Sequence, residues 1–151
     1  MCCSRSWLTI GAVMAGLSVT AGAFGAHGLD TYFEKKYADI DVKKIGGHEV
    51  PASFKYLEDF KTAARYQMYH AFGLMAVGLL ALRQPKRSLN VAGWCFLLGI
   101  VLFSGSLYVL TIGGPHWQGI RWGLVAPFGG MLLIAGWVAL AVAACGIGNR
   151  E

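Results

Sequence analysis

Four apolar segments, each long enough to cross a bilayer as a helix, dominate this sequence. They run from about Trp7 to Ala26, from Thr62 to Leu82, from Leu89 to Ile112 and from Trp122 to Gly146. A hydrocarbon core about 30 Å thick needs roughly 20 apolar residues in a helix. Because lipid offers no partners to backbone N–H and C=O groups, helices are the expected form. We therefore predict an all-α membrane protein, a four-transmembrane-helix bundle with a long, partly helical first loop, forming a single integral membrane domain over residues 1–151.

The composition agrees with a chain that lies in a lipid bilayer. Hydrophobic residues make up 56% of the sequence and charged residues only 14%, whereas soluble domains carry about 25% charged residues. The net charge of +5 needs no nucleic-acid partner, because basic residues beside membrane spans are the usual signal of orientation. A basic patch interleaved with aromatic residues, which would indicate nucleic-acid binding, is missing.

The first apolar segment has two interpretations. It begins after Arg5 and contains the small-x-small pattern Ala21-Gly22-Ala23, as a cleaved signal peptide does. Its apolar run is longer than the 7–15 residues of a signal peptide. We expect a retained helix, with cleavage as the alternative.

The extramembrane loop, about residues 29–61, holds most of the charge in the sequence. Thr31 and Glu34 have the spacing of a capping box, which predicts a short helix. Gly46-Gly47 and Pro51 then break regular structure. From Ser53 onward the apolar residues follow helical spacing, which predicts an interfacial amphipathic piece that runs into the second span. A solvated loop with local packing is the alternative.

Basic residues predict the orientation. One side carries Arg5, Arg83, Lys86, Arg87 and Arg150. The other side carries more basic residues, but most of them lie in the long first loop and are mixed with acidic ones. Because the orientation rule rests on bases in short segments near span ends, we expect both termini in the cytoplasm, in a bacterial inner (plasma) membrane.

Polar residues inside the spans gather in the non-cytoplasmic half of the membrane. An unpaired polar group in hydrocarbon costs several kcal/mol, so we expect His70 to hydrogen-bond to a hydroxyl group or to His27. The predicted cluster, which is either structural or a binding site, consists of His27, Arg65, Tyr66, Gln67, His70, Ser104, Ser106 and Tyr108.

Small residues and one proline predict how the helices pack. Small residues let membrane helices approach closely, and Pro127 is expected to kink or loosen the fourth helix. The residues singled out for packing or a kink are Gly22, Gly25, Pro127, Gly129 and Gly130.

Several of these stretches together resemble a known family. "GAFGAHGL", "FKTAARYQMYHAFGL", "VLFSGSLYVL" and "APFGGMLLIAGW" occur in this order. In this respect the sequence is similar to the small four-span membrane proteins of domain of unknown function 423, the transmembrane protein 256-like family. The first loop looks longer than is usual there. The resemblance implies an integral membrane protein, of bacterial inner-membrane or mitochondrial type, and implies no activity.

Three functions remain open at the level of sequence. The favoured one is a structural or interaction component that binds lipid, a partner membrane protein or a second copy of itself. The second is a small-molecule or proton pathway through the His/Tyr/Ser cluster. The third is a haem or copper redox site at His27 and His70, with His48 and His116 as further ligands. No catalytic motif is present, so the sequence favours a protein without enzyme activity over an enzyme of unidentified reaction, and the favoured function needs no metal and no cofactor.

Overall fold

Four long helices account for most of the chain. The computed structural model describes residues 2–40, 42–114 and 116–145. The long helices are α1 (Cys2–His27), α3 (Ala52–Arg83), α4 (Arg87–Gly113) and α5 (Ala126–Cys145). The predicted end of the fourth span, Gly146, and the predicted cytoplasmic Arg150 lie outside the described residues.

Three stretches in the described part of the chain are long and apolar enough to cross a membrane. They are Ser4–His27, Arg87–Gly113 and Trp122–Cys145. The predicted second span, 62–82, lies within α3, and the polar side chains between 65 and 70 lower the mean hydropathy of that helix. Composition therefore supports three of the four predicted spans.

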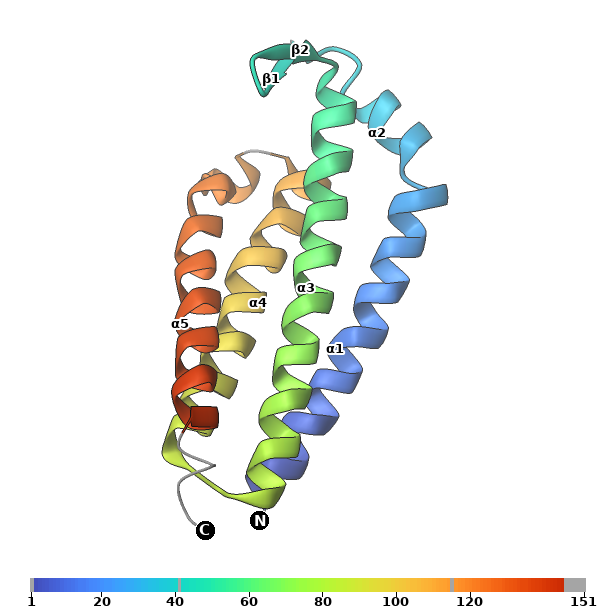
Figure 1. The fold of residues 1–151 in the computed structure, drawn as a ribbon. Helices are drawn as coiled ribbons and strands as arrows, with labels where there is room; N and C mark the ends of the chain where they lie inside the picture. The colour runs from blue at the N-terminus through green and yellow to red at the C-terminus, as the bar shows by residue number, and fades with distance from the viewer. Residues whose placement is uncertain (1, 41, 115, 146–151) are drawn as a thin grey trace.

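The helices form an antiparallel row. α1 packs on α3, α3 packs on α4, and α4 packs on α5, while α1 and α5 lie at opposite edges (Figure 1). The first residues of α1 and the last residues of α5 lie at the same end of the bundle (Figure 1). In this neighbour order, α3 is the helix on which α1 mainly packs.

The core of the bundle is built from aromatic rings set against glycines. Phe96 of α4 is fully buried and lies against Gly73 of α3 and Gly136 of α5. Trp7 of α1 packs on Gly93 of α4 and donates its indole N–H to the side-chain oxygen of Asn90 at 3.1 Å. The first two turns of α1 and of α4 are therefore in direct contact.

The long loop folds into a cap over the other end of the bundle (Figure 1). It contains α2 (Asp30–Lys36) and the antiparallel strands β1 (Lys43–Ile45) and β2 (His48–Val50). Gly46 and Gly47 form the two-residue turn, with φ of +55° and +86°, a geometry that favours glycine. The hairpin was not predicted, because the residues that flank the two glycines are mostly charged and show no apolar strand pattern, although a Gly-Gly pair is itself a hairpin-turn signal.

The short helix α2 forms where it was expected, but its predicted cap does not. Its N-cap residue is Leu29, with no side-chain hydrogen bond. Thr31 lies inside the helix, so the expectation of a capping box was wrong. The residues after Pro51 were expected to run into the second span, and α3 does continue unbroken from Ala52.

An aromatic cluster fastens the cap to α3. Phe33 and Tyr37 pack with Tyr56, Leu57 and Phe60. The rings of Tyr37 and Tyr56 stack with their centroids 4.1 Å apart. Burial of these rings ties α2 to the first turns of α3.

Two side chains of the cap also pair with the last turn of α4. The Tyr37 hydroxyl donates to the Thr111 carbonyl at 2.5 Å, and the Lys36 ammonium donates to the Ile112 carbonyl. The last carbonyls of a helix have no partners within that helix. The cap therefore supplies donors that α4 itself lacks.

Candidate functional site

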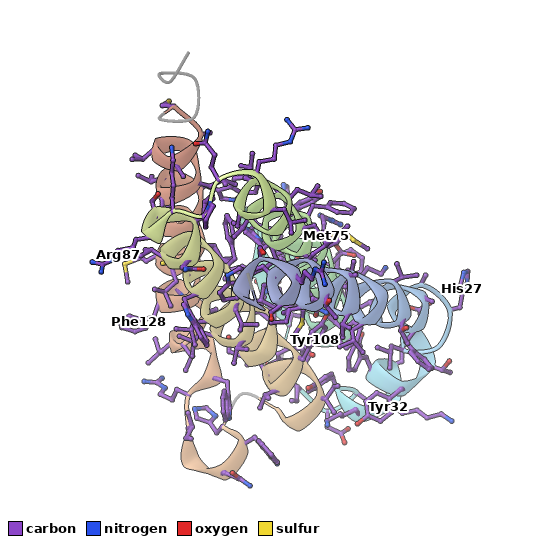
Figure 2. All side chains as sticks on the ribbon, turned by 90° about the horizontal axis from the view of Figure 1, so that it is seen from below. His27, Tyr32, Met75, Arg87, Tyr108 and Phe128 are labelled. Carbon is purple, nitrogen blue, oxygen red and sulfur yellow. The ribbon has the colours of Figure 1, made fainter. Side chains whose placement is uncertain are left out.

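Gln67 joins three helices at the centre of the predicted polar cluster. It is buried on α3, and its amide N–H donates to the Met14 carbonyl of α1 at 2.9 Å. Its amide oxygen accepts the Tyr108 hydroxyl of α4 at 3.1 Å. Both ends of the amide are thus paired across helix interfaces, with Tyr108 lying among the helices (Figure 2).

Ser18 forms a second bond between α1 and α3 in the reverse direction. Its hydroxyl, which is buried, donates to the Ala64 carbonyl at 2.7 Å. Met14 and Ser18 are one helical turn apart, and so are Ala64 and Gln67. Sequence reasoning missed Ser18, although an isolated serine within an apolar span is itself a signal, because it needs a partner.

His70 is buried among aromatic rings and pairs with its own helix. Its Nδ1 lies 2.7 Å from the Tyr66 carbonyl, so Nδ1 carries the proton and donates. The ring centroids of Phe96 and Trp137 lie 5.8 Å and 6.0 Å from that of His70. The expected bond to a hydroxyl group or to His27 is absent from the described residues, and that prediction was wrong.

His27 and His70 are far apart, which rules them out as a ligand pair. Gly11 of α1 is level with Ala71 of α3, so His70 lies beside the first half of α1, while His27 ends that helix. Sixteen residues separate Gly11 from His27, a rise of about 24 Å. His27 is exposed and points away from the bundle (Figure 2). The hypothesis of haem or copper held between these two histidines was therefore wrong.

The other predicted cluster residues divide between the interior and the surface. Ser104 and Ser106 are buried, and the Ser106 hydroxyl donates to the Phe103 carbonyl at 2.9 Å. Arg65 and Tyr66 are exposed. Helical spacing explains the division, because Gln67 and His70 share the inner face of α3 and Arg65 is turned away from it.

The Ser104 hydroxyl is buried without a partner in the described part of the chain. Burying a hydroxyl group without a hydrogen bond costs about 1–3 kcal/mol. We expect Ser104→Ala to raise the free energy of unfolding by about 1 kcal/mol. Unfolding in detergent, followed by circular dichroism, measures this, and Ser18→Ala should shift it in the opposite direction. A Ser104→Ala variant less stable than the parent would show that this hydroxyl is bonded.

The cap should respond to alkaline pH through two buried tyrosines. Burial raises the pKa of Tyr37 above its ordinary value, and Tyr56 and then Tyr32 add to the rise. Burial also raises the pKa of Tyr56, with a further contribution from the Asp59 carboxylate. A group whose pKa is higher in the folded than in the unfolded chain contributes stability below the unfolded pKa, and this is lost as the pH rises through the folded pKa.

We therefore expect the cap to loosen above about pH 10, the ordinary tyrosine value. Deprotonation of Tyr37 also removes the donor to the Thr111 carbonyl. Near-ultraviolet circular dichroism, compared with tyrosinate absorbance, follows this change. Tyr37→Phe should weaken the pH dependence, and an alkaline transition of unchanged size in that variant would contradict the assignment.

Close helix packing falls on only some of the residues singled out for it. Gly25 lies against Phe60, and Gly129 lies against the backbone of α4. Gly130 has ordinary contacts, and a Cβ at Gly22 would meet no atom within 4 Å, so close packing was wrongly assigned to Gly22. Pro127 lies in the first turn of α5, where its missing N–H has no partner to lose. The expected kink was therefore wrong.

Comparisons with known proteins place the chain among membrane proteins. The family model described as "Protein of unknown function (DUF423)" matches residues 21–130. The UPF0382 membrane protein YwdK of Bacillus subtilis is 40% identical over 141 residues, which cover 93% of this chain and 96% of that protein. The UPF0382 membrane protein SH2409 of Staphylococcus haemolyticus is 38% identical over 139 residues, covering 91% and 93%. A UPF0382 membrane protein of Haemophilus influenzae is 36% identical over 138 residues, covering 91% of each chain. No solved structure matches.

Proposed function

Because this chain belongs to the DUF423 family, whose bacterial relatives are membrane proteins of uncharacterised function, we propose that it is a non-catalytic structural or interaction component of the membrane. In this proposal the bundle provides a stable scaffold within the bilayer. Its partners are lipids together with another membrane protein or a second copy of the chain.

The observation that carries the proposal is the pair of hydrogen bonds by which the Gln67 side chain links α3 to α1 and to α4. The Gln67 amide donates one N–H to the Met14 carbonyl of α1, and its oxygen accepts the Tyr108 hydroxyl of α4. Both of these hydrogen bonds run to other helices, so the polar side chain at the centre of the cluster joins the helices of the bundle. Hydrogen bonds of this kind join membrane helices, each contributing about 0.6–2 kcal/mol.

We also propose that α3 crosses the membrane as the second of four spans. Both termini then lie in the cytoplasm, and the membrane is the inner membrane of a bacterium. α3 packs against both α1 and α4, and its polar side chains at Gln67 and His70 are buried in the bundle. A helix whose polar groups are hidden this way crosses lipid at a lower cost than its composition indicates. Arg5, Arg83 and Arg87 lie at one end of the bundle, which supports the orientation.

A pathway for protons or small molecules is supported less well. The rings of Tyr66, Phe96 and Trp137 surround His70. The same Phe96 ring fills the space between Gly73 and Gly136. Within the described residues, the neighbours that these contacts give His70 are aromatic rings and the Tyr66 carbonyl, which favours a packing role over a proton relay.

The proposal is tested by isolating the protein from native membranes in a mild detergent. The mass of the complex, from light scattering, and the identity of co-purifying proteins are compared with those of a tagged, unrelated membrane protein of similar size. We expect a homo-oligomer or a partner protein in fixed stoichiometry. A monomer that carries neither would contradict an interaction role.

A further inference from the structure

A positively charged cavity opens between α1 and α3 near the capped end of the bundle. Its volume is about 280 Å³, and its lining includes Lys61, Arg65 and Tyr69 of α3 and Ser18 and Gly22 of α1. The three α3 residues are four apart in sequence, so they lie on one face of that helix. The cavity is therefore bordered by a row of two cations and a phenol.

Of the two cations in this row, only Lys61 is paired with a carboxylate within the described residues. The Lys61 ammonium forms an ion pair with the Glu58 carboxylate at 3.6 Å, one turn before it on the same helix, and both side chains are partly exposed to solvent. Within the described residues, Arg65 has no carboxylate within 4.0 Å and makes no hydrogen bond. The Ser18 hydroxyl is already paired with the Ala64 carbonyl. The groups left to a ligand are donors, which is the chemistry that recognises an anion.

Gly22 leaves open space on the α1 side of the cavity, because it has no side chain. A Cβ built at this position would meet no atom within 4 Å, whereas glycines that serve helix packing, such as Gly11, would clash with the neighbouring helix. Gly22 therefore leaves room beside the cations. Gly22 thus borders the cavity and makes no close contact with a neighbouring helix.

The position of the cavity along α3 indicates the kind of anion. Lys61 directly precedes the proposed span 62–82, and Arg65 lies one turn inside it. Met68 continues the lining toward the membrane interior, and the neighbouring Phe72 is exposed on the outer surface. Cations at the boundary with an apolar surface beside them match the two parts of a phospholipid, the phosphate and the acyl chain, and in the orientation proposed above this lipid lies in the non-cytoplasmic leaflet.

We propose that this cavity between α1 and α3 binds an anionic phospholipid. Lys61 and Arg65 hold the phosphate group, and one acyl chain lies along Met68 toward the centre of the membrane. Electrostatic attraction of this kind is additive over a few basic residues and becomes weaker with salt.

The full chain in detergent micelles is titrated with phosphatidylglycerol or with phosphatidylcholine of the same acyl chains, and bound lipid is counted by native mass spectrometry. We expect a preference for phosphatidylglycerol. Lys61→Gln with Arg65→Gln should weaken its binding about tenfold or more. The matched control, Lys44→Gln with Arg121→Gln, removes the same charge from exposed residues at the same end of the bundle and should change binding by less than about threefold.

A second variant keeps both cations and closes the cavity. Gly22→Leu should also weaken phosphatidylglycerol binding, since the new side chain occupies the open space while the helix remains favourable. Equal binding of phosphatidylglycerol to the parent and to both cavity variants would overturn the proposal. So would displacement of the lipid by millimolar inorganic phosphate, because the site would then recognise a free anion.

Discussion

Replacing Gln67 with leucine should destabilise the bundle by about 2–3 kcal/mol. The substitution removes the donor to the Met14 carbonyl and the acceptor of the Tyr108 hydroxyl. The Tyr108 hydroxyl then loses its partner where water is scarce, which adds the cost of an unpaired buried group to the loss of the bonds. The free energy of unfolding in mixed detergent and dodecyl sulfate, followed by circular dichroism, measures the change.

A matched substitution separates the effect of losing the two Gln67 hydrogen bonds, called here the Gln67 bridge, from a general effect of adding leucine. Gln84→Leu makes the same chemical change at the residue after α3, where the side chain makes no hydrogen bond within the described residues. It should leave the free energy of unfolding within about 0.5 kcal/mol of the parent. Tyr108→Phe, alone and combined with Gln67→Leu, completes a double-mutant cycle. Additive effects in that cycle, or equal stability of Gln67→Leu and the parent, would show that the bridge contributes nothing.

The arrangement of the long helices could be predicted because it depends on properties that each segment carries alone. Apolar length marks three spans directly, and short basic or glycine-rich connections set their antiparallel order. α3 was predicted from the same rule, although its own composition is too polar to show a span. Gln67 and His70 of α3 are nevertheless buried in the bundle, which is a property of the fold and not of the segment.

The membership of the polar cluster could be predicted only in part, because it depends on the rotation of each helix about its axis. Gln67 and Arg65 are two residues apart, and one is buried while the other is exposed. No sequence pattern in the second segment fixes which of them faces α1. The same is true of depth, since His27 and His70 were both placed in the outer half of the membrane although many residues of α1 separate their levels.

The partners of small residues could not be predicted either, because a glycine is equally small whether or not another helix lies beside it. Gly129 and Gly130 are adjacent and looked equivalent in the sequence. In the structure a Cβ at Gly129 would lie 2.3 Å from the backbone nitrogen of Phe103, whereas a Cβ at Gly130 would lie 3.8 Å from the Phe103 ring. One of these glycines meets a helix backbone and the other meets the edge of a flexible side chain.

Gly129→Ala should therefore destabilise the bundle by about 3 kcal/mol. The new methyl group meets backbone atoms of Leu102 and Phe103, which cannot move aside without moving α4 as a whole. Separation of α4 from α5 would also loosen the contact between Gly136 and the Phe96 ring. The measurement is the free energy of unfolding in mixed detergent and dodecyl sulfate.

Gly130→Ala is the control for this prediction, because it adds the same methyl group one residue later in the same helix. Alanine favours a helix over glycine by about 1 kcal/mol, and its Cβ would make only ordinary contacts, so this variant should equal or exceed the parent in stability. The opposite signs expected for neighbouring residues distinguish backbone contact from helix propensity, which changes equally at both. Equal effects at the two positions would mean that the distance between α4 and α5 is set by other contacts. A loss confined to Gly129 would show that direct backbone approach fixes this pair of helices.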